Sequence, residues 1–488
     1  MNYSIILKTL SSVMWIMALA FSACAGVSAI YADNPLEAYA MQCWVCVIAL
    51  SITAAIALYI PSRNAAKTMF RKEAMCIIGI AWFLTSAVGA LPYAIILDVP
   101  AATAFFESAS GITTTGASIF GDFSIFAPSL MFWRCLSHWI GGLGVVVFFV
   151  AVLSFLGASG KILYSNETGV DSGNFEAARI RSGVMTIVKI YITLSVCCFA
   201  GLRFFGMDNF DAVCHAFSIV STGGFSTKIT GIAEYGMGVR WCAIVFMFLG
   251  GTSFALLAAL TKFKFNRLLS SSEFWTYVLI IFAASAISVV LLEYTTQRPF
   301  WENLSYGVFE AVSSATSTGL FCDNRQTWLP AAQTILLMVG IVGGCSGSTS
   351  GGLKVSRVVA SFRICKRETE KSYRPRVVRN VFLNGKVLDD SDAGEILSYV
   401  VLYILVAALG ITALSLLEPK LGTTGTISAV FAMLSNIGPG LAEVGCDSNY
   451  GILSNPAQFL LSIFMIMGRL EFYAVLVLIM PSLWKKFQ

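Results

Sequence analysis

Four short segments of this 488-residue chain repeat one pattern of small polar residues and glycine. The segments are Thr114, Thr115 and Gly116; Ser221, Thr222 and Gly223; Ser317, Thr318 and Gly319; and Asn436, Ile437 and Gly438. Glycine permits backbone conformations, including positive φ, that aim successive carbonyl oxygens in one direction. Rings of such oxygens can replace the hydration shell of an alkali cation. One Thr-x-Gly is a weak signal, but four copies predict the ion-binding loops of a pore.

The spacing of these glycines indicates an internal repeat. Successive glycines lie 107, 96 and 119 residues apart, which is enough for an apolar span, a re-entrant loop and a second span. Glu107 and Glu310 each precede the glycine of their segment by nine residues. The C-terminal end of a short helix before each glycine would direct partial negative charge toward a cation. The repeating unit is therefore predicted to be span, pore loop, span.

The composition requires a membrane around these loops. Hydrophobic residues make up 57% of the chain and charged residues 12%, whereas soluble domains carry about 25% charged residues. The net charge of +5 is too small and too dispersed for a nucleic-acid-binding protein. Because a span needs roughly 20 apolar residues, ten segments qualify: about 8–31, 42–61, 74–97, 131–156, 183–205, 238–261, 274–296, 331–361, 394–417 and 457–481. The predicted fold is an all-α integral membrane protein with ten transmembrane helices.

The predicted domains follow from these spans and loops. They are an N-terminal two-helix extension over 1–73 and four pore repeats over 74–156, 157–272, 273–390 and 391–488. Of the 32 Lys and Arg residues, 24 fall on the side that holds both chain ends, which predicts cytoplasmic termini. The other connections carry acidic residues, Glu107 and Glu310 among them, which either concentrate cations near the pore or simply decorate the translocated face. The basic block from Lys354 to Lys386 either contacts anionic lipid or a partner, or only fixes topology.

A glycine-rich run interrupts the eighth apolar segment. Its residues are Gly343, Gly344, Cys345, Ser346, Gly347, Ser348, Thr349, Ser350, Gly351 and Gly352. Each glycine inside a helix costs about 1 kcal/mol relative to alanine, so a continuous helix is not expected here. The run is predicted to be a flexible gate that occludes the pore; the alternative is a tight helix crossing built from small residues.

One arginine lies near the centre of the last apolar segment. A charge at this depth costs about 3 kcal/mol unless it faces water or a partner. Arg469 is therefore predicted to face the pore and to form an electrostatic barrier to cations; a structural ion pair is the alternative. Glu471 points to another face of an ideal helix, so it is expected to pair with a basic residue elsewhere, with Lys354 a candidate.

The remaining reactive residues offer little for catalysis. Most of the 13 cysteines lie in apolar runs and are expected to be buried free thiols, including the pair Cys43 and Cys46. His138 and His215 are the only histidines and lie far apart in the sequence. A membrane enzyme is thus a poor hypothesis.

These motifs resemble the Trk/Ktr/HKT family of potassium transporters. The resemblance rests on the four loops, on Trp133-Arg134, on His138 to Gly144, on Gly343 to Lys354 and on Gly468 to Glu471, and it covers the chain from about residue 74. The two spans before that point are similar to the TrkH/TrkG branch. The fourth loop has Asn-x-Gly-Pro-Gly, which is the usual form of the family.

The resemblance implies the fold, the partners and the roles of residues. It implies a central potassium pore with four-fold pseudosymmetry, a homodimer in the bacterial inner membrane, and a cytoplasmic nucleotide-binding regulatory partner of the TrkA kind. In such proteins Gly116, Gly223, Gly319 and Gly438 are the filter glycines. Serine at the first of these positions marks sodium-preferring relatives, so Gly116 favours potassium.

The expected function is potassium uptake through a four-loop filter with a glycine-rich gate. Potassium is the transported ion, and no organic cofactor, enzymatic activity or nucleic-acid partner is expected. The alternative is a secondary potassium symporter, coupled to H⁺ or Na⁺, in which broken helices hold the ion near the bilayer midplane.

Overall fold

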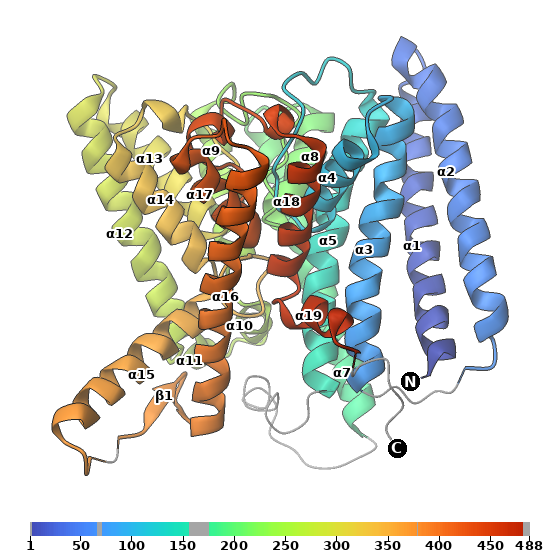
Figure 1. The fold of residues 1–488 in the computed structure, drawn as a ribbon. Coiled ribbons are helices and arrows are strands. Elements are labelled where there is room, and N and C mark those ends of the chain that lie inside the picture. The colour runs from blue at the N-terminus through green and yellow to red at the C-terminus, as the bar shows by residue number, and fades with distance from the viewer. Residues whose placement is uncertain (1, 66–70, 156–174, 378, 482–488) are drawn as a thin grey trace.

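Long apolar helices that run roughly side by side make up most of the computed structural model, which describes residues 2–65, 71–155, 175–377 and 379–481 (Figure 1). Among these residues, six helices are long and apolar enough to cross a membrane, or eight if each of two bent pairs counts as one span. The predicted number of ten spans stays a prediction. Lys67, Lys161, Lys485, Lys486 and the boundary predicted between residues 156 and 157 lie outside the described residues.

One order of elements recurs four times after a helical hairpin. The hairpin is α1 (Tyr3–Ile30) and α2 (Pro35–Tyr59), followed by the 3₁₀ turn η1 (Ile60–Ser62). Each repeat then has a long helix, a short helix, a loop and a further helix. These are α3 (Arg71–Ile96), α4 (Ala101–Ile112) and α5 (Pro128–Phe155); α7 (Phe175–Phe204), α8 (Asn209–Val220) and α9 (Met237–Gly250); α12 (Ser272–Thr295), α13 (Phe300–Ala315) and α14 (Pro330–Val342); and α16 (Asp390–Leu417), α17 (Thr423–Leu434) and α18 (Asn455–Arg469).

Elements outside the four repeats complete the described chain. They are α10 (Phe254–Leu260), α11 (Phe265–Leu269), α15 (Val355–Tyr373), α19 (Tyr473–Ile479), the 3₁₀ turns η3 (Arg325–Thr327), η4 (Ala442–Val444) and η5 (Tyr450–Ile452), and the antiparallel strands β1 (Val381–Leu383) and β2 (Lys386–Leu388). Pro35, Pro128 and Pro330 each occupy the first position of a helix, where the missing N–H leaves no hydrogen bond unmade.

Three of the predicted spans are broken. The glycine-rich run separates α14 from α15, as predicted. The other two breaks bend the chain by 101° between α9 and α10 and by 119° between α18 and α19. Arg469 lies at a break in its span and not within a continuous helix, because α18 ends at Arg469 and the backbone turns through positive φ at Glu471 and Phe472.

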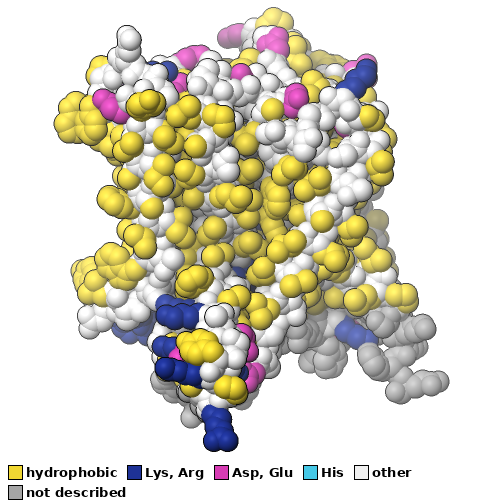
Figure 2. Space-filling model, turned by 60° about the vertical axis from the view of Figure 1, so that its left-hand side comes forward, with side chains coloured by type: hydrophobic (Ala, Val, Ile, Leu, Met, Phe, Trp, Pro, Cys, Tyr) yellow, Lys and Arg dark blue, Asp and Glu magenta, His cyan; other side chains and the backbone are white. Residues whose placement is uncertain are grey.

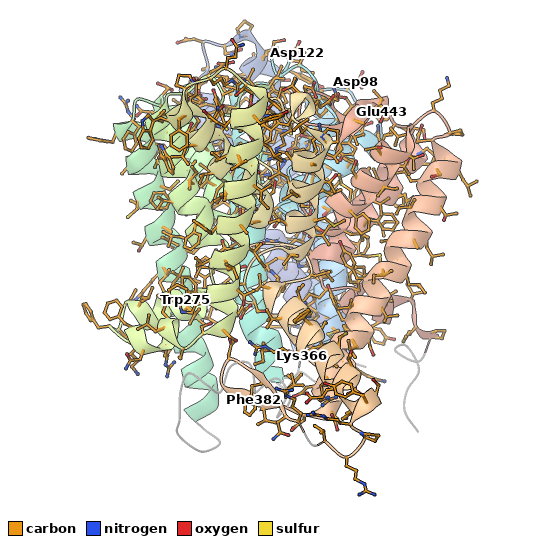
Figure 3. All side chains as sticks on the ribbon, turned by 90° about the vertical axis from the view of Figure 1, so that its left-hand side faces the viewer. Asp98, Asp122, Trp275, Lys366, Phe382 and Glu443 are labelled. Atoms are coloured by element: carbon orange, nitrogen blue, oxygen red, sulfur yellow. The ribbon has the colours of Figure 1, made fainter. Side chains whose placement is uncertain are left out.

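The two ends of the bundle differ in charge. Figure 2 shows hydrophobic side chains over the middle of the visible face, with Lys and Arg gathered at the lower end and most Asp and Glu at the upper end. The lower end, called the basic end here, holds the start of α1, α15 and α19 (Figure 1). Asp98, Asp122 and Glu443 lie at the opposite end, called the acidic end (Figure 3). This arrangement is typical of a protein that spans a bilayer.

A buried carboxylate fastens the hairpin to the first repeat. Glu37 on α2 accepts hydrogen bonds from the backbone N–H of Ser129 at 2.6 Å and from its hydroxyl at 2.7 Å, at the start of α5. The indole of Trp44 also donates to the Ser129 hydroxyl at 2.8 Å. Negative charge at a helix N-terminus is favourable, so this contact fixes α2 against α5.

Replacing Glu37 with Ala is expected to lower the free energy of unfolding by about 1–3 kcal/mol, because the buried N–H of Ser129 loses its acceptor. Thermal unfolding of the purified protein in one detergent measures the effect. Asp33→Ala, at an exposed position in the turn between α1 and α2, is the control and should leave the midpoint unchanged. Equal midpoints for Glu37→Ala and the unmodified protein would contradict this role.

Candidate functional site

The segments that follow the four short helices adopt one backbone conformation. The second residue after each helix has positive φ, and so does the glycine two residues later; the pairs are Thr114 and Gly116, Thr222 and Gly224, Ser317 and Gly319, and Asn436 and Gly438. Positive φ is uncommon outside glycine. Its recurrence at four matching positions shows that the fold imposes this conformation on each segment.

The register predicted for the second segment is one residue off. The sequence Ser221-Thr222-Gly223-Gly224 offers two glycines, and the first was matched to Gly116. The backbone matches Gly224 to Gly116 instead, since Gly224 has the positive φ of +86°. Gly223 then corresponds to Thr115, and its N–H bonds to a carbonyl five residues earlier, as that of Thr115 does.

The four segments meet in a closed ring. A Cβ atom added to the glycine of one segment would overlap a backbone carbonyl oxygen of the next; the pairs are Gly116 with Gly223, Gly224 with Thr318, Gly319 with Ile437, and Gly438 with Thr115. Any side chain at these positions would push the neighbouring segment away. The amide of Asn436 also donates to the hydroxyl of Thr115 at 2.9 Å, which joins the last segment to the first.

Behind the ring lie two buried ion pairs. Glu107 accepts a hydrogen bond from Arg134 Nε at 2.7 Å and from the N–H of Ile119 at 3.1 Å. Glu310 pairs with Arg325 and accepts from the N–H of Cys322 at 2.8 Å. Both carboxylates are fully buried, so the prediction that they belong to an acidic outer face is wrong. Each carboxylate instead connects its short helix, α4 or α13, to the loop that follows the segment after that helix.

Arg134 also reaches the second segment. Its guanidinium donates to the carbonyl of Ser226 at 2.9 Å and lies 3.6 Å from the ring centroid of Phe225. His138, one helical turn along α5, accepts from the N–H of Phe225 at 3.2 Å through Nε2, so its Nδ1 carries the proton that it donates to the carbonyl of Gly111 at 2.7 Å. These two side chains of α5 thus connect the first segment to the second.

Among the described residues, the second and fourth segments have no Glu–Arg pair on their own short helix and are supported by other side chains. In the second, His215 contacts the hydroxyl of Ser226 at 2.9 Å through Nε2. In the fourth, the hydroxyl of Tyr450 donates to the carbonyl of Gly438 at 2.9 Å. Arg134, Arg325, His215 and Tyr450 were not among the residues predicted for the site, although the equal spacing of Glu107 and Glu310 was a usable signal for the first two.

The glycine-rich run lies directly against this ring. The N–H of Gly351 donates to the hydroxyl of Ser317 at 2.5 Å, and Ser350 contacts that hydroxyl at 3.1 Å. The Thr349 hydroxyl donates to the carbonyl of Gly250 at 3.0 Å. The run therefore bridges the third segment and the bend between α9 and α10.

Two buried cations hold the run in place. Arg469 donates to the carbonyl of Thr349 at 2.7 Å, and the amino group of Lys354 donates to the carbonyl of Ser350. The Nε and second terminal nitrogen of Arg469 have no acceptor in the described part of the chain. Arg469 therefore has no structural ion pair among these residues, and its side chain faces the carbonyl of Thr349 in the run.

The suggested pairing of Glu471 with Lys354 is wrong. Glu471 pairs with Arg357 at 2.5 Å, and Arg357 also lies 4.1 Å from the ring centroid of Tyr399. The positive φ at Glu471 turns its side chain toward α15, where Arg357 lies. The break after α18 therefore links the end of that helix to α15.

Residues 44–486 match the family of TrkH cation transport proteins. The chain belongs to the TrkH family. The Trk system potassium uptake protein TrkH of Halomonas elongata is 30% identical over 495 residues, covering 100% of both chains. TrkH of Escherichia coli K12 is 30% identical and covers 94% of this chain and 95% of its own. TrkG of that organism is 31% identical and covers 85% and 86%.

A solved TrkH structure has the same fold. The crystal structure of the potassium transporter TrkH from Vibrio parahaemolyticus superposes with a TM-score of 0.89 at 24% identity, covering 99% of this chain and 100% of that chain. The relatives of this TrkH-family chain are named as transport proteins, so the family is one of membrane transporters and not of enzymes.

We expect Glu107→Leu to cost about 3–5 kcal/mol of stability, because it leaves Arg134 buried without its partner. The double variant Glu107→Leu/Arg134→Met should lose clearly less than the sum of the two single variants. Thermal unfolding in detergent of all four proteins closes this double-mutant cycle. Additive losses would show that the two side chains do not act as a pair.

Proposed function

We propose that this chain conducts potassium into the cell through a central pore, with the closed ring as its selectivity filter. The filter residues are Thr114 to Gly116, Thr222 to Gly224, Ser317 to Gly319 and Asn436 to Gly438. The observation that carries the proposal is the ring closure, in which each glycine abuts a carbonyl of the next segment. The potassium uptake named for the relatives agrees with it.

The chemistry of the filter is that of uncharged ligands. Backbone carbonyls replace the water around the ion without holding it by a fixed charge. The short helices α4, α8, α13 and α17 all end at the ring, so their C-terminal dipoles favour a cation there. Glu107 and Glu310 add no free charge, since both are paired with arginine. Ion selectivity then depends on how firmly the carbonyls are held.

The glycine-rich run is the gate in this proposal. It contacts the ring at Ser317 and is held by Arg469 and Lys354 through adjacent carbonyls. The two positive charges repel a cation that has passed the filter. To open the gate, the run must move away from the side chains of Arg469 and Lys354. Its glycines make such a change of backbone conformation accessible.

The orientation and the partners belong to the same proposal. The basic end faces the cytoplasm of a bacterial cell, as the positive-inside rule requires, so both termini are cytoplasmic in the inner membrane. The chain acts with a regulatory partner, which agrees with the naming of its relatives as members of a Trk system. The homodimer and the cytoplasmic TrkA-like nucleotide-binding subunit are what the family resemblance implies. The acidic end faces the external potassium.

A coupled symporter is the second candidate, favoured by the two bent helix pairs. Breaks of 101° and 119° are the kind of discontinuity that alternating-access transporters place around a bound ion. Flux that rises in proportion to the potassium driving force, at zero gradient of H⁺ and Na⁺, identifies the channel mechanism. Flux that needs one of those gradients identifies the symporter.

The first experiment compares potassium, rubidium, sodium and lithium flux into liposomes that contain the purified protein, under an imposed potassium diffusion potential. The filter predicts that potassium and rubidium pass and that sodium and lithium do not. Equal flux of all four ions would overturn the filter. Because a closed gate also gives no flux, the Arg469→Ala variant is measured in parallel.

Gly116→Ser is expected to admit sodium, since its Cβ would displace the carbonyl of Gly223 and alter the ring. The measurement is the ratio of sodium to potassium flux in liposomes, with intact folding checked by thermal unfolding. Gly236→Ser, where no atom lies within 4 Å of an added Cβ, is the matched control. An unaltered ratio in well-folded Gly116→Ser would remove Gly116 from the filter.

Arg469→Ala should raise basal potassium flux, because it removes both the barrier charge and the hydrogen bond to Thr349. Arg469→Lys keeps the charge and is expected to give a smaller increase. Both are measured without the regulatory partner, at matched protein content per liposome. Unchanged or lower flux in folded Arg469→Ala protein would refute the barrier role.

A further inference from the structure

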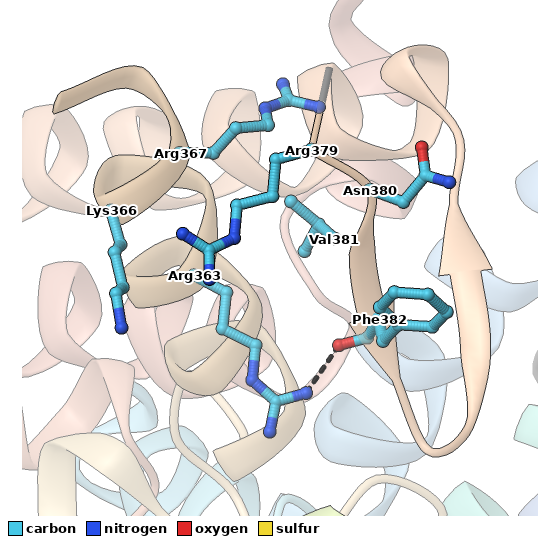
Figure 4. A pocket seen from close by; sticks show the side chains of 7 residues that line it. All are labelled: Arg363, Lys366, Arg367, Arg379, Asn380, Val381 and Phe382. Atoms are coloured by element: carbon cyan, nitrogen blue, oxygen red, sulfur yellow. Dashed lines mark hydrogen bonds between the residues drawn. The ribbon is translucent and has the colours of Figure 1, made fainter. Parts of the chain in front are cut away.

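A basic pocket lies apart from the pore at the basic end. It encloses about 230 Å³ and is lined by Arg363, Lys366, Arg367, Arg379, Asn380, Val381 and Phe382. The first three come from α15, and the others come from β1 and the residues just before it. Figure 4 shows Arg379 reaching from the strand side toward Arg363 and Lys366 on the helix. The ring, the glycine-rich run and Arg469 take no part in it.

The charges of the pocket are only partly balanced. Arg367 pairs with Glu368 and Asp390 at 2.9 Å each, and Arg379 pairs with Glu370. These carboxylates do not line the pocket, and neither does any other acidic residue. Arg363 and Lys366 have no ion pair within the described chain. Their charges are thus available to a bound anion.

The donor chemistry of the pocket suits phosphate groups. A guanidinium offers planar pairs of N–H donors that match two oxygens of one phosphate, and lysine adds a point charge. Arg363 uses one terminal nitrogen on the carbonyl of Phe382, which fixes its side chain and leaves the other donors for a ligand. The charges of Arg363 and Lys366, unpaired within the described chain, repel each other in this small pocket, and a multiply charged anion offsets that repulsion.

We propose that this pocket binds the phosphate groups of a small anion and thereby clamps the β1–β2 hairpin onto α15. Two sources share this chemistry, a lipid headgroup and a dissolved phosphate compound. Figure 3 shows Lys366 and Phe382 farther toward the basic end than Trp275, a half-exposed aromatic of α12. The site is on α15, which begins shortly after the glycine-rich run and is tied to the turn that follows α18 by the Arg357–Glu471 pair.

The test uses the full chain in nanodiscs of a zwitterionic lipid, titrated with inorganic pyrophosphate in a calorimeter at constant salt. A second arm adds phosphatidylglycerol to the detergent-solubilised protein and counts bound lipid by native mass spectrometry. Arg363→Ala/Lys366→Ala should weaken binding of the active probe about tenfold or more, as expected when charge-assisted bonds of roughly 1.4 kcal/mol in total are lost. Lys262→Ala/Lys264→Ala removes the same charge outside the pocket and should change binding less than about twofold.

The outcomes separate the sources and can overturn the proposal. Pyrophosphate binding that is lost in the pocket variant identifies a dissolved ligand, and lipid binding lost in it identifies a headgroup. Because Arg363 also supports the hairpin, Lys366→Ala alone, which breaks no hydrogen bond or ion pair of the described chain, must weaken the same binding. Binding of neither probe, or equal weakening by pocket and control variants, refutes the site. None of these measurements depends on ion flux, so failure of the proposed function leaves them interpretable.

Discussion

The site depends on one steric constraint, the contact between the glycine of each segment and the backbone of the next. Four such contacts close a ring, and none tolerates a Cβ atom. Because the contacts run in a circle, displacing any one segment opens two of them. The surrounding helices can therefore vary in length and side chains, provided that they deliver four short helices whose ends meet at one place. This explains why four repeats with little sequence in common keep the same positive-φ backbone.

The supports behind the ring show how one chain keeps four unlike segments alike. A tetramer of identical subunits would use one support four times, whereas here two segments use a Glu–Arg pair, one uses His215 and one uses Tyr450. Burying an ion pair is costly unless its remaining donors and acceptors are satisfied. Glu107 and Glu310 meet that condition through backbone N–H groups of their own loops. Each pair thus fixes loop geometry at little electrostatic cost.

Patterns that recur in the sequence predicted the apolar helices and the break at the glycine-rich run, and they placed Gly116, Gly319 and Gly438 in the register that the backbone has. The predictions were wrong where the local sequence is compatible with more than one backbone conformation. Thr222 is followed by two glycines, and only backbone φ distinguishes Gly224 from Gly223. The segment through Arg469 has no proline or glycine at the turn itself, because the positive φ after α18 is taken up by Glu471 and Phe472. Partners distant in sequence, such as Arg357 for Glu471, depend on that turn and were not predictable.

Filter and gate are physically joined in the proposed mechanism. The hydroxyl of Ser317, whose own backbone belongs to the ring, accepts the N–H of Gly351 in the run. If the run moves away from Arg469, this bond must break or Ser317 must follow. A moving Ser317 would disturb the close contact between Gly319 and Ile437, where even an added Cβ atom would overlap the carbonyl oxygen. The bond to Gly351 is therefore the part that yields, which keeps the ring intact while the gate opens and lets the buried supports behind the ring, not the gate, determine selectivity.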